Sequence, residues 1–183
     1  LIFATKDGLM KKTTLESYSR PRANGIIALG LREGDRLIRV TLTDGNSQML
    51  VASYNGKVVR FPEDSVRPMG RTATGVRAIK LDEDGQDRVI GMICVEEDSK
   101  ESVLVISEKG YGKRTDLNDE NGEAIYRITN RGAKGVKTMN LTDKTGDLAA
   151  LLLVNPEEDI LLITDDGTII RTSVEDVRFC GRS

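Results

Sequence analysis

One pattern occurs four times along the chain and constrains its fold more than any other feature. An apolar run leads into a turn that contains glycine, and a second run then carries a cation near its end. The four copies begin at Leu1, Met49, Val103 and Ile160, and their turn glycines, Gly8, Gly56, Gly110 and Gly167, lie about fifty residues apart. Asp-Gly and Asn-Gly between β-prone runs favour tight hairpins, because the turn requires positive φ. The sequence therefore predicts four β-hairpins.

A second block of two runs follows each of the first three hairpins. Residues 25–29, 75–79 and 135–139 are expected to form a third strand entered through a glycine, and residues 35–38, 87–90 and 147–150 a fourth strand. Four short strands in a period of this length are typical of propeller blades, which stack on their neighbours to bury an otherwise bare face. A flat β-sandwich is the structural alternative, and the regular long period favours the radial arrangement.

We expect one all-β domain that forms a partial ring of such blades. The units cover residues 1–47, 48–101, 102–158 and 159–183, and the third carries an insertion around Asn121 to Arg127, between its second and third strands. Because Gly181-Arg182 aligns with Gly70-Arg71, the last unit is expected to stop in mid-pattern. Since residues 1–5 already have the character of a strand, we expect the natural N-terminus to lie upstream.

The composition disfavours several classes of function. The chain has no histidine, and its two cysteines, Cys94 and Cys180, have no metal-ligand or redox spacing. The segment 70–75 has the glycine spacing of a phosphate-binding loop, but Val76 stands where that loop needs lysine. With no nucleophile–base pair in the pattern, we expect neither catalysis nor a cofactor. No apolar run is long enough for a membrane helix, so we expect a cytoplasmic protein with no membrane partner.

The charges alternate along the sequence, although the formal net charge is only −2. Residues 56–80 hold six Lys and Arg against two Asp and Glu, whereas residues 81–102 hold eight acidic residues against two cations. The third unit repeats this alternation less cleanly. In a ring of repeats, equivalent positions come to the same radius and height, so the cations are expected to form a continuous band. Such a band suits a phosphate backbone that follows a curved surface.

Two groups of cations are candidates for binding duplex DNA. The first group lies mainly between the second strand of a unit and the end of its third: Arg20, Arg22, Arg67, Arg71, Arg77, Arg127, Arg131, Lys134 and Lys137. The second group closes the second strands: Lys12, Arg60, Lys113, Arg114 and Arg171. A cation at the end of a strand can instead shield a sheet edge, and any single surface cation can serve solubility alone.

The same residues carry a resemblance to a known family. The runs 56–61, 66–77, 110–115, 131–136 and 164–168 resemble the C-terminal domain of DNA gyrase A, and the similarity follows the repeat over nearly the whole chain. The resemblance implies a six-bladed β-pinwheel, in which neighbouring blades share strands and a basic perimeter wraps duplex DNA with little sequence specificity. It further implies a nucleoid-associated bacterial protein that acts with the rest of gyrase A and with gyrase B in an A2B2 complex, where ATP-driven strand passage yields negative supercoils.

The chain departs from that family in two respects. It lacks the basic Gln-Arg-Arg-Gly-Gly-Lys-Gly type of loop in the first blade, and it lacks the region of the catalytic tyrosine. The chain alone is therefore expected not to cut DNA, and ATP and Mg belong to other parts of the implied complex.

The sequence is compatible with two alternative functions. The C-terminal domain of the topoisomerase IV protein homologous to gyrase A, which steers the choice of DNA substrate, is one possibility, and the run 110–115 favours gyrase over it. A protein-binding propeller is the other, and it is expected to present an apolar or aromatic patch and not a basic band.

Overall fold

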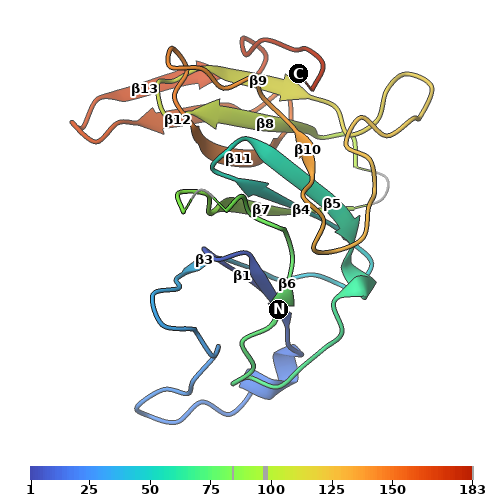
Figure 1. Ribbon diagram of the computed structural model, residues 1–183, viewed down its shortest axis with the longest axis vertical. Helices are drawn as coiled ribbons and strands as arrows, with labels where there is room; N and C mark the ends of the chain where they lie inside the picture. Colours follow the sequence, from blue (N-terminus) through green and yellow to red (C-terminus); the bar gives the residue numbers. More distant parts are fainter. Residues whose placement is uncertain (84, 97–98, 183) are drawn as a thin grey trace.

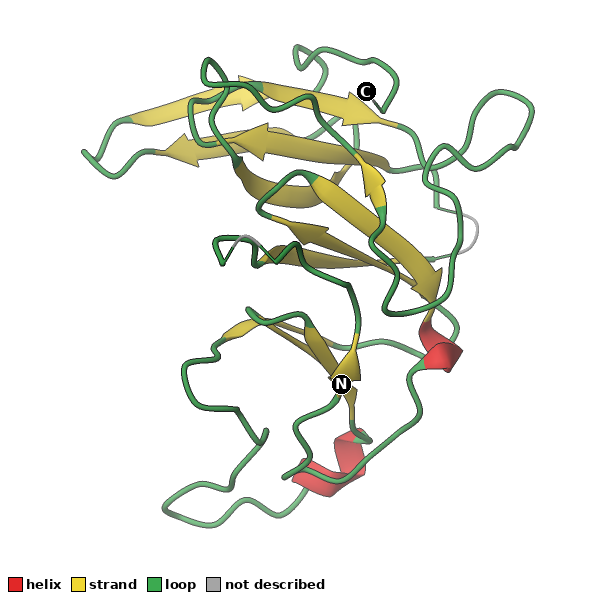
Figure 2. Cartoon of the chain, viewed as in Figure 1, coloured by secondary structure: helices red, strands yellow, loops and turns green. Residues whose placement is uncertain are grey.

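The computed structural model describes residues 1–83, 85–96 and 99–182, and it consists mainly of β-strands and connecting loops (Figures 1 and 2). The strands in chain order are β1 (Ile2–Thr5), β2 (Leu9–Lys12), β3 (Leu37–Thr41), β4 (Gln48–Ser53), β5 (Lys57–Pro62), β6 (Val76–Arg77), β7 (Val89–Val95), β8 (Ser102–Ser107), β9 (Gly112–Thr115), β10 (Val136–Lys137), β11 (Leu148–Val154), β12 (Asp159–Ile163) and β13 (Ile169–Ser173). Two short 3-10 turns are η1 (Leu15–Tyr18) and η2 (Glu63–Ser65). No helix among the described residues is long and apolar enough to cross a membrane.

The four predicted hairpins are confirmed. Strands β1–β2, β4–β5, β8–β9 and β12–β13 pair antiparallel, and the turn glycines Gly8, Gly56, Gly110 and Gly167 have φ of 82°, 78°, 79° and 85°. This left-handed conformation is what glycine adopts without steric cost. Aspartates that precede the fourth strands cap two of these turns: Asp35 Oδ1 accepts from the Asp7 amide at 2.9 Å, and Asp87 Oδ1 accepts from the Asn55 amide at 3.1 Å.

Neighbouring units share strands, because the third strand of one unit joins the sheet of the unit before it. The first sheet has the order β3-β1-β2-β6, so its outermost strand comes from the second unit, and Met10 pairs with Val76. The second sheet has the order β10-β5-β4-β7, and Val58 pairs with Val136 of the third unit. This arrangement confirms the strand sharing that the resemblance implied, and it ties the first blade to the second and the second to the third (Figure 1).

The third strand predicted at residues 25–29 is wrong, since these residues form no strand. In this fold a third strand pairs with the second strand of the preceding unit, and residues 1–183 hold no unit before the first. The side chain of Ile27 is accordingly 64% exposed. The other two predicted third strands form the short strands β6 and β10.

The core consists of three apolar clusters between successive sheets. Met10 of the first blade packs with Met49 and Phe61 of the second, and Leu50 of the second packs with Val103 of the third. A smaller cluster joins the third blade to Val174 after the last hairpin. The blades therefore stack in an open arc from bottom to top in Figure 1. Within the part of the chain that the structure describes, β12 and β13 pair only with each other, and Leu161, Ile163 and Ile169 are 64%, 69% and 63% exposed.

Candidate nucleic-acid interface

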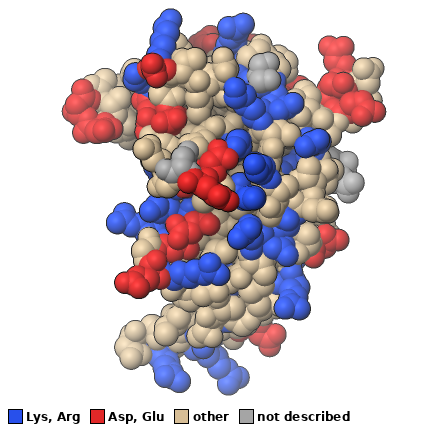
Figure 3. Space-filling model, viewed as in Figure 1, with Lys and Arg blue, Asp and Glu red and all other residues tan. Residues whose placement is uncertain are grey.

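The connection between the second and third strands lies at an equivalent place in successive units. Parallel bridges join Lys12 to Pro68, Arg60 to Ile128 and Arg114 to Phe179. In each case the end of one unit's second strand contacts the connection of the following unit. The basic connections therefore recur along one edge of the stacked blades, as the repeat predicts. Figure 3 shows many Lys and Arg down the centre and right of this face, with some Asp and Glu among them and others at the left and on projecting tips; further Lys and Arg lie at the left and at the bottom.

The exposed cations of these connections and third strands form a set that we call the basic edge. It comprises Arg20, Arg22, Arg67, Arg77, Arg127, Lys134, Lys137 and Arg178, all of which are exposed. Among the described residues, no carboxylate lies within ion-pair distance of any of them. The Lys137 ammonium donates to Asn140 Oδ1 at 3.1 Å, which leaves its charge unopposed. These side chains are placed to contact an external anion.

Arg178 belongs to the basic edge although sequence reasoning did not select it. It directly precedes Phe179, as Arg67 precedes Pro68 and Arg127 precedes Ile128, so the three arginines hold the same position relative to the three bridges. The alignment of residues 177–179 with residues 66–68 is the sequence signal that identifies it.

Arg71 and Arg131 lie in the same connections but are half-buried. Arg71 Nη1 donates to the carbonyl oxygen of Ile27 at 2.9 Å. Arg131 Nη1 donates to the carbonyl oxygen of Arg77 at 2.7 Å, and its Nε donates to that of Ser65 at 3.3 Å. Both guanidinium groups therefore donate hydrogen bonds to backbone carbonyl oxygens of the protein itself.

Arg60 and Lys113, predicted as DNA contacts, lie inside the fold with 5% and 8% of their surface exposed. Arg60 Nε donates to Gln48 Oε1 at 2.6 Å, and its Nη1 donates at 3.2 Å to the carbonyl oxygens of Leu117 and of Tyr126. Lys113 Nζ donates to the carbonyl oxygen of Gly181 at 2.7 Å. Burial lowers the pKa of both groups, because the charged form loses hydration. We assign these two side chains to the stacking of blades and leave them out of the interface.

The remaining strand-end cations also have hydrogen-bond or ion-pair partners within the protein. Arg114 donates to the carbonyl oxygens of Val177 and Glu175 at 3.0 and 2.9 Å. Lys12 lies 3.4 Å from the buried carboxylate of Glu63, and Arg171 Nε donates to Asp159 at 2.8 Å. The structure places all five strand-end cations against protein acceptors, which agrees with the edge-shielding alternative for this group.

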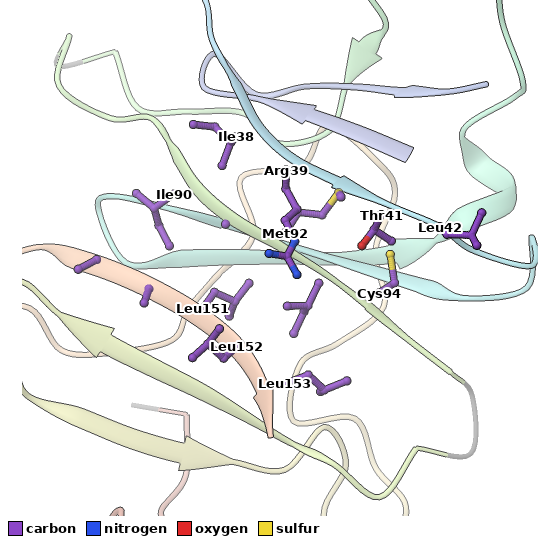
Figure 4. A pocket seen from close by; sticks show the side chains of 14 residues that line it. Ile38, Arg39, Thr41, Leu42, Ile90, Met92, Cys94, Leu151, Leu152 and Leu153 are labelled. Carbon is purple, nitrogen blue, oxygen red and sulfur yellow. The ribbon is translucent and has the colours of Figure 1, made fainter. Parts of the chain in front are cut away.

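A separate groove lies on the inner side of the arc. It has a volume of about 500 Å³ and is lined by β3, β7 and β11. Figure 4 shows Ile38, Leu42, Met92 and Leu151 around it, together with Arg39. Most of the described lining residues are apolar, and Arg39 is the one cation among them, so the groove is chemically unlike the basic edge. Among the described residues, no group of three His, Cys, Asp or Glu is placed to hold a metal ion.

Stacked blades that exchange strands define the fold as a β-pinwheel, a variant of the propeller. The chain belongs to the family described as DNA gyrase C-terminal domain, beta-propeller, whose model matches residues 1–44, 48–96, 101–155 and 158–183. This match confirms the family to which the sequence showed a resemblance.

Relatives and solved structures agree with this family. The chain is 44% identical over 183 residues to the A subunit of DNA gyrase from Staphylococcus aureus strain MRSA252, and equally to that from strain NCTC 8325. The match covers 100% of this chain and 20% of those proteins, so the chain spans about a fifth of their length.

Among solved structures, the C-terminal domain of DNA topoisomerase IV has a TM-score of 0.88 at 26% identity, covering 99% of this chain and 54% of that one. The DNA gyrase A C-terminal domain has a TM-score of 0.83 at 23% identity, with coverages of 99% and 57%. The Escherichia coli ParC C-terminal domain has a TM-score of 0.69 at 18% identity, with coverages of 98% and 74%. The last two likenesses bear on the fold alone.

Proposed function

We propose that this chain binds duplex DNA along the basic edge and bends it around the stacked blades, with little sequence specificity. The observation that carries the proposal is the recurrence of exposed cations at equivalent positions. Arg67, Arg127 and Arg178 hold one such position, and Arg77 and Lys137 hold another. A repeat of charge along a stack of blades suits a duplex, whose phosphates also recur along its length, and contacts to phosphates need no reading of bases.

The energetics of bending favour many weak contacts over a few strong ones. Smooth bending of a 20–30 base-pair segment by 40–90° costs of order 1–6 kcal/mol. Each neutralised phosphate releases counterions and changes the slope of log affinity against log salt by about −0.9. The long side chains of the basic edge supply such contacts one at a time. Their number therefore offsets the cost of the bend, and no single arginine is expected to be decisive.

In the cell we propose that this domain acts as the C-terminal part of gyrase A. The rest of gyrase A and gyrase B would form the A2B2 complex with it, in the cytoplasm at the nucleoid, and that complex would introduce negative supercoils. The 44% identity to gyrase A supports this assignment. The domain would bind the DNA and set its path around the blades, whereas cleavage, ATP hydrolysis and Mg binding would belong to other parts of the complex.

A salt series tests the proposal directly. The chain is mixed with a labelled duplex of about one hundred base pairs, and the affinity is measured from about 50 to 200 mM salt. We expect binding that weakens steeply with salt and is indifferent to sequence. Absence of binding at the lowest salt, or one strongly preferred sequence in a footprint, would refute it.

The likeness to the topoisomerase IV structure supports a second candidate, a domain that steers substrate choice without full wrapping. A nicked plasmid that is religated in the presence of the chain distinguishes the two. Wrapping is expected to trap a change of linking number that grows with the amount of protein bound. Binding without such a change would favour the second candidate.

A further inference from the structure

Three arginines at one repeat position make the same hydrogen bond. Arg71, Arg131 and Arg182 each lie four residues after an arginine of the basic edge, and each donates through Nη1 to a backbone carbonyl oxygen. The acceptors belong to Ile27, Arg77 and Lys137, at 2.9, 2.7 and 2.8 Å. These three acceptors also share one position, two residues after the glycines Gly25, Gly75 and Gly135. A bond that recurs in register at three junctions is a regular feature of the fold and not an isolated contact.

Backbone hydrogen bonds accompany the arginines at two of the junctions. The Gly30 amide donates to the carbonyl oxygen of Ala73 at 3.3 Å, and the equivalent Lys80 amide donates to that of Ala133 at 2.9 Å. The Gly132 amide, next to Arg131, donates to the carbonyl oxygen of Ala78 at 2.7 Å. The connection of each unit is thus joined to the third-strand region of the unit before it, along the same edge that carries the exposed cations.

Buried lysines fix the arginines themselves at the two outer junctions. Lys11 Nζ donates to the backbone carbonyl of Arg71, and Lys113 Nζ donates to that of Arg182. The equivalent position in the middle unit is Val59, and there Arg131 gains its second bond, to the carbonyl oxygen of Ser65. The planar guanidinium suits this role, because its several N–H groups hold a fixed geometry whereas a lysine ammonium rotates freely.

We propose that Arg71, Arg131 and Arg182 are positioning residues that hold successive blades in register along the basic edge. Arg131 and Arg182 hold the backbone of Arg77 and Lys137, so they set where those two exposed cations stand relative to the next blade. The consequence for DNA rests on the proposed function, because a bent duplex meets all contacts only if their spacing is fixed. The consequence for the blade junction is independent of DNA.

Hydrogen exchange of the Lys80 and Gly132 amides tests the proposal in Arg131→Ala. Loss of a charge-assisted bond at the junction is expected to speed the exchange of both amides about tenfold. The matched control is Arg127→Ala, which removes an exposed arginine of the same connection and is expected to leave both rates unchanged. Unchanged rates in folded Arg131→Ala would overturn the proposal. If that variant does not fold, Arg71→Ala is read at the Gly30 amide with the same criterion.

The salt dependence of DNA binding provides a second test, which separates a positioning role from direct contact with DNA. Arg127→Ala is expected to reduce the salt slope by about 0.9, the value for one phosphate. Arg131→Ala is expected to reduce it as well, and adding Arg77→Ala to that variant is expected to change it no further, since Arg77 is already displaced. A further reduction of about 0.9 on adding Arg77→Ala would overturn the positioning role. If the unchanged chain binds no DNA, the proposed function fails, and the exchange rates still decide the role of the arginines.

Discussion

Neutralising four cations of the basic edge is the perturbation that bears most directly on the proposed function. The variant carries Arg67→Gln, Arg77→Gln, Arg127→Gln and Lys137→Gln, all at exposed side chains. With about 0.9 in salt slope for each phosphate contact, the four together account for a slope of about 3.6. Over a fourfold rise in salt this corresponds to a factor of about 150 in affinity. Between about 50 and 200 mM salt, the fold-loss of affinity is therefore expected to be about 150 times smaller for the variant than for the unchanged chain.

The assay is fluorescence anisotropy of a labelled duplex, with thermal unfolding measured on the same samples. Exposed substitutions of this kind are expected to change the free energy of unfolding by no more than about 0.5 kcal/mol each. A matched control neutralises two exposed lysines of the acidic stretches, as Lys100→Gln and Lys144→Gln, and it is expected to keep the slope. An unchanged slope in the folded fourfold variant would refute the assignment of the basic edge. A loss of about half as much slope in the control, in proportion to its two charges, would show that binding follows total charge and not position.

Three further predictions concern the fold that supports this edge. Arg60→Ala removes a buried guanidinium that bonds two backbone carbonyls and a glutamine, and we expect urea unfolding to show a loss of about 1–3 kcal/mol, since buried acceptors are left unpaired; a loss clearly below about 1 kcal/mol would contradict its structural role. Burial raises the pKa of the Cys94 thiol to about 12, so the folded state disfavours the thiolate. The unfolding free energy should therefore fall as pH rises above the ordinary thiol pKa, by at most about 1.4 kcal/mol per unit, and Cys94→Ala should weaken that dependence in urea titrations between about pH 8 and 10.5. Gly135→Ala would place Cβ 2.5 Å from the carbonyl oxygen of Val58. Gly122 has a similar positive φ, but a Cβ there would lie in open space. We therefore expect calorimetry to show that Gly135→Ala is less stable than Gly122→Ala by at least about 1 kcal/mol.

The sequence was sufficient to predict the elements that depend on local chemistry. The hairpins at Gly8, Gly56, Gly110 and Gly167 follow from a turn that demands positive φ between β-prone runs, and the structure has all four. The exchange of strands between units was expected only through the family resemblance. Local periodicity does not reveal it, because β6 and β10 pair with strands of the preceding unit. The error at residues 25–29 has the same origin, since a strand needs a partner that local sequence does not specify.

The roles of individual cations were the part that sequence could not separate. Arg60 and Arg67 stand seven residues apart in the same basic run, yet one is buried and the other is exposed. The four residues Val58 to Phe61 are all buried, because both faces of this strand are covered, so no alternation of polar and apolar residues marks Arg60. Its acceptors at Leu117 and Tyr126 lie in the next unit. Only the stacking of blades brings them together, and stacking is a property of the tertiary structure.

The separation of basic and acidic stretches explains how a chain with a net charge of −2 can present a basic surface, and the structure divides its cations between that surface and the junctions. Lys11, Arg60 and Lys113 bond to backbone carbonyls of following units, and they act inside the junctions. The exposed cations then stand on a backbone whose geometry the junctions fix. Each added blade brings one more set of both kinds, so the number of phosphate contacts is expected to rise with the number of blades and not with net charge. We therefore expect the strength of DNA binding to depend on how many blades are held in register, and under the proposed function the junctions would matter as much as the exposed arginines.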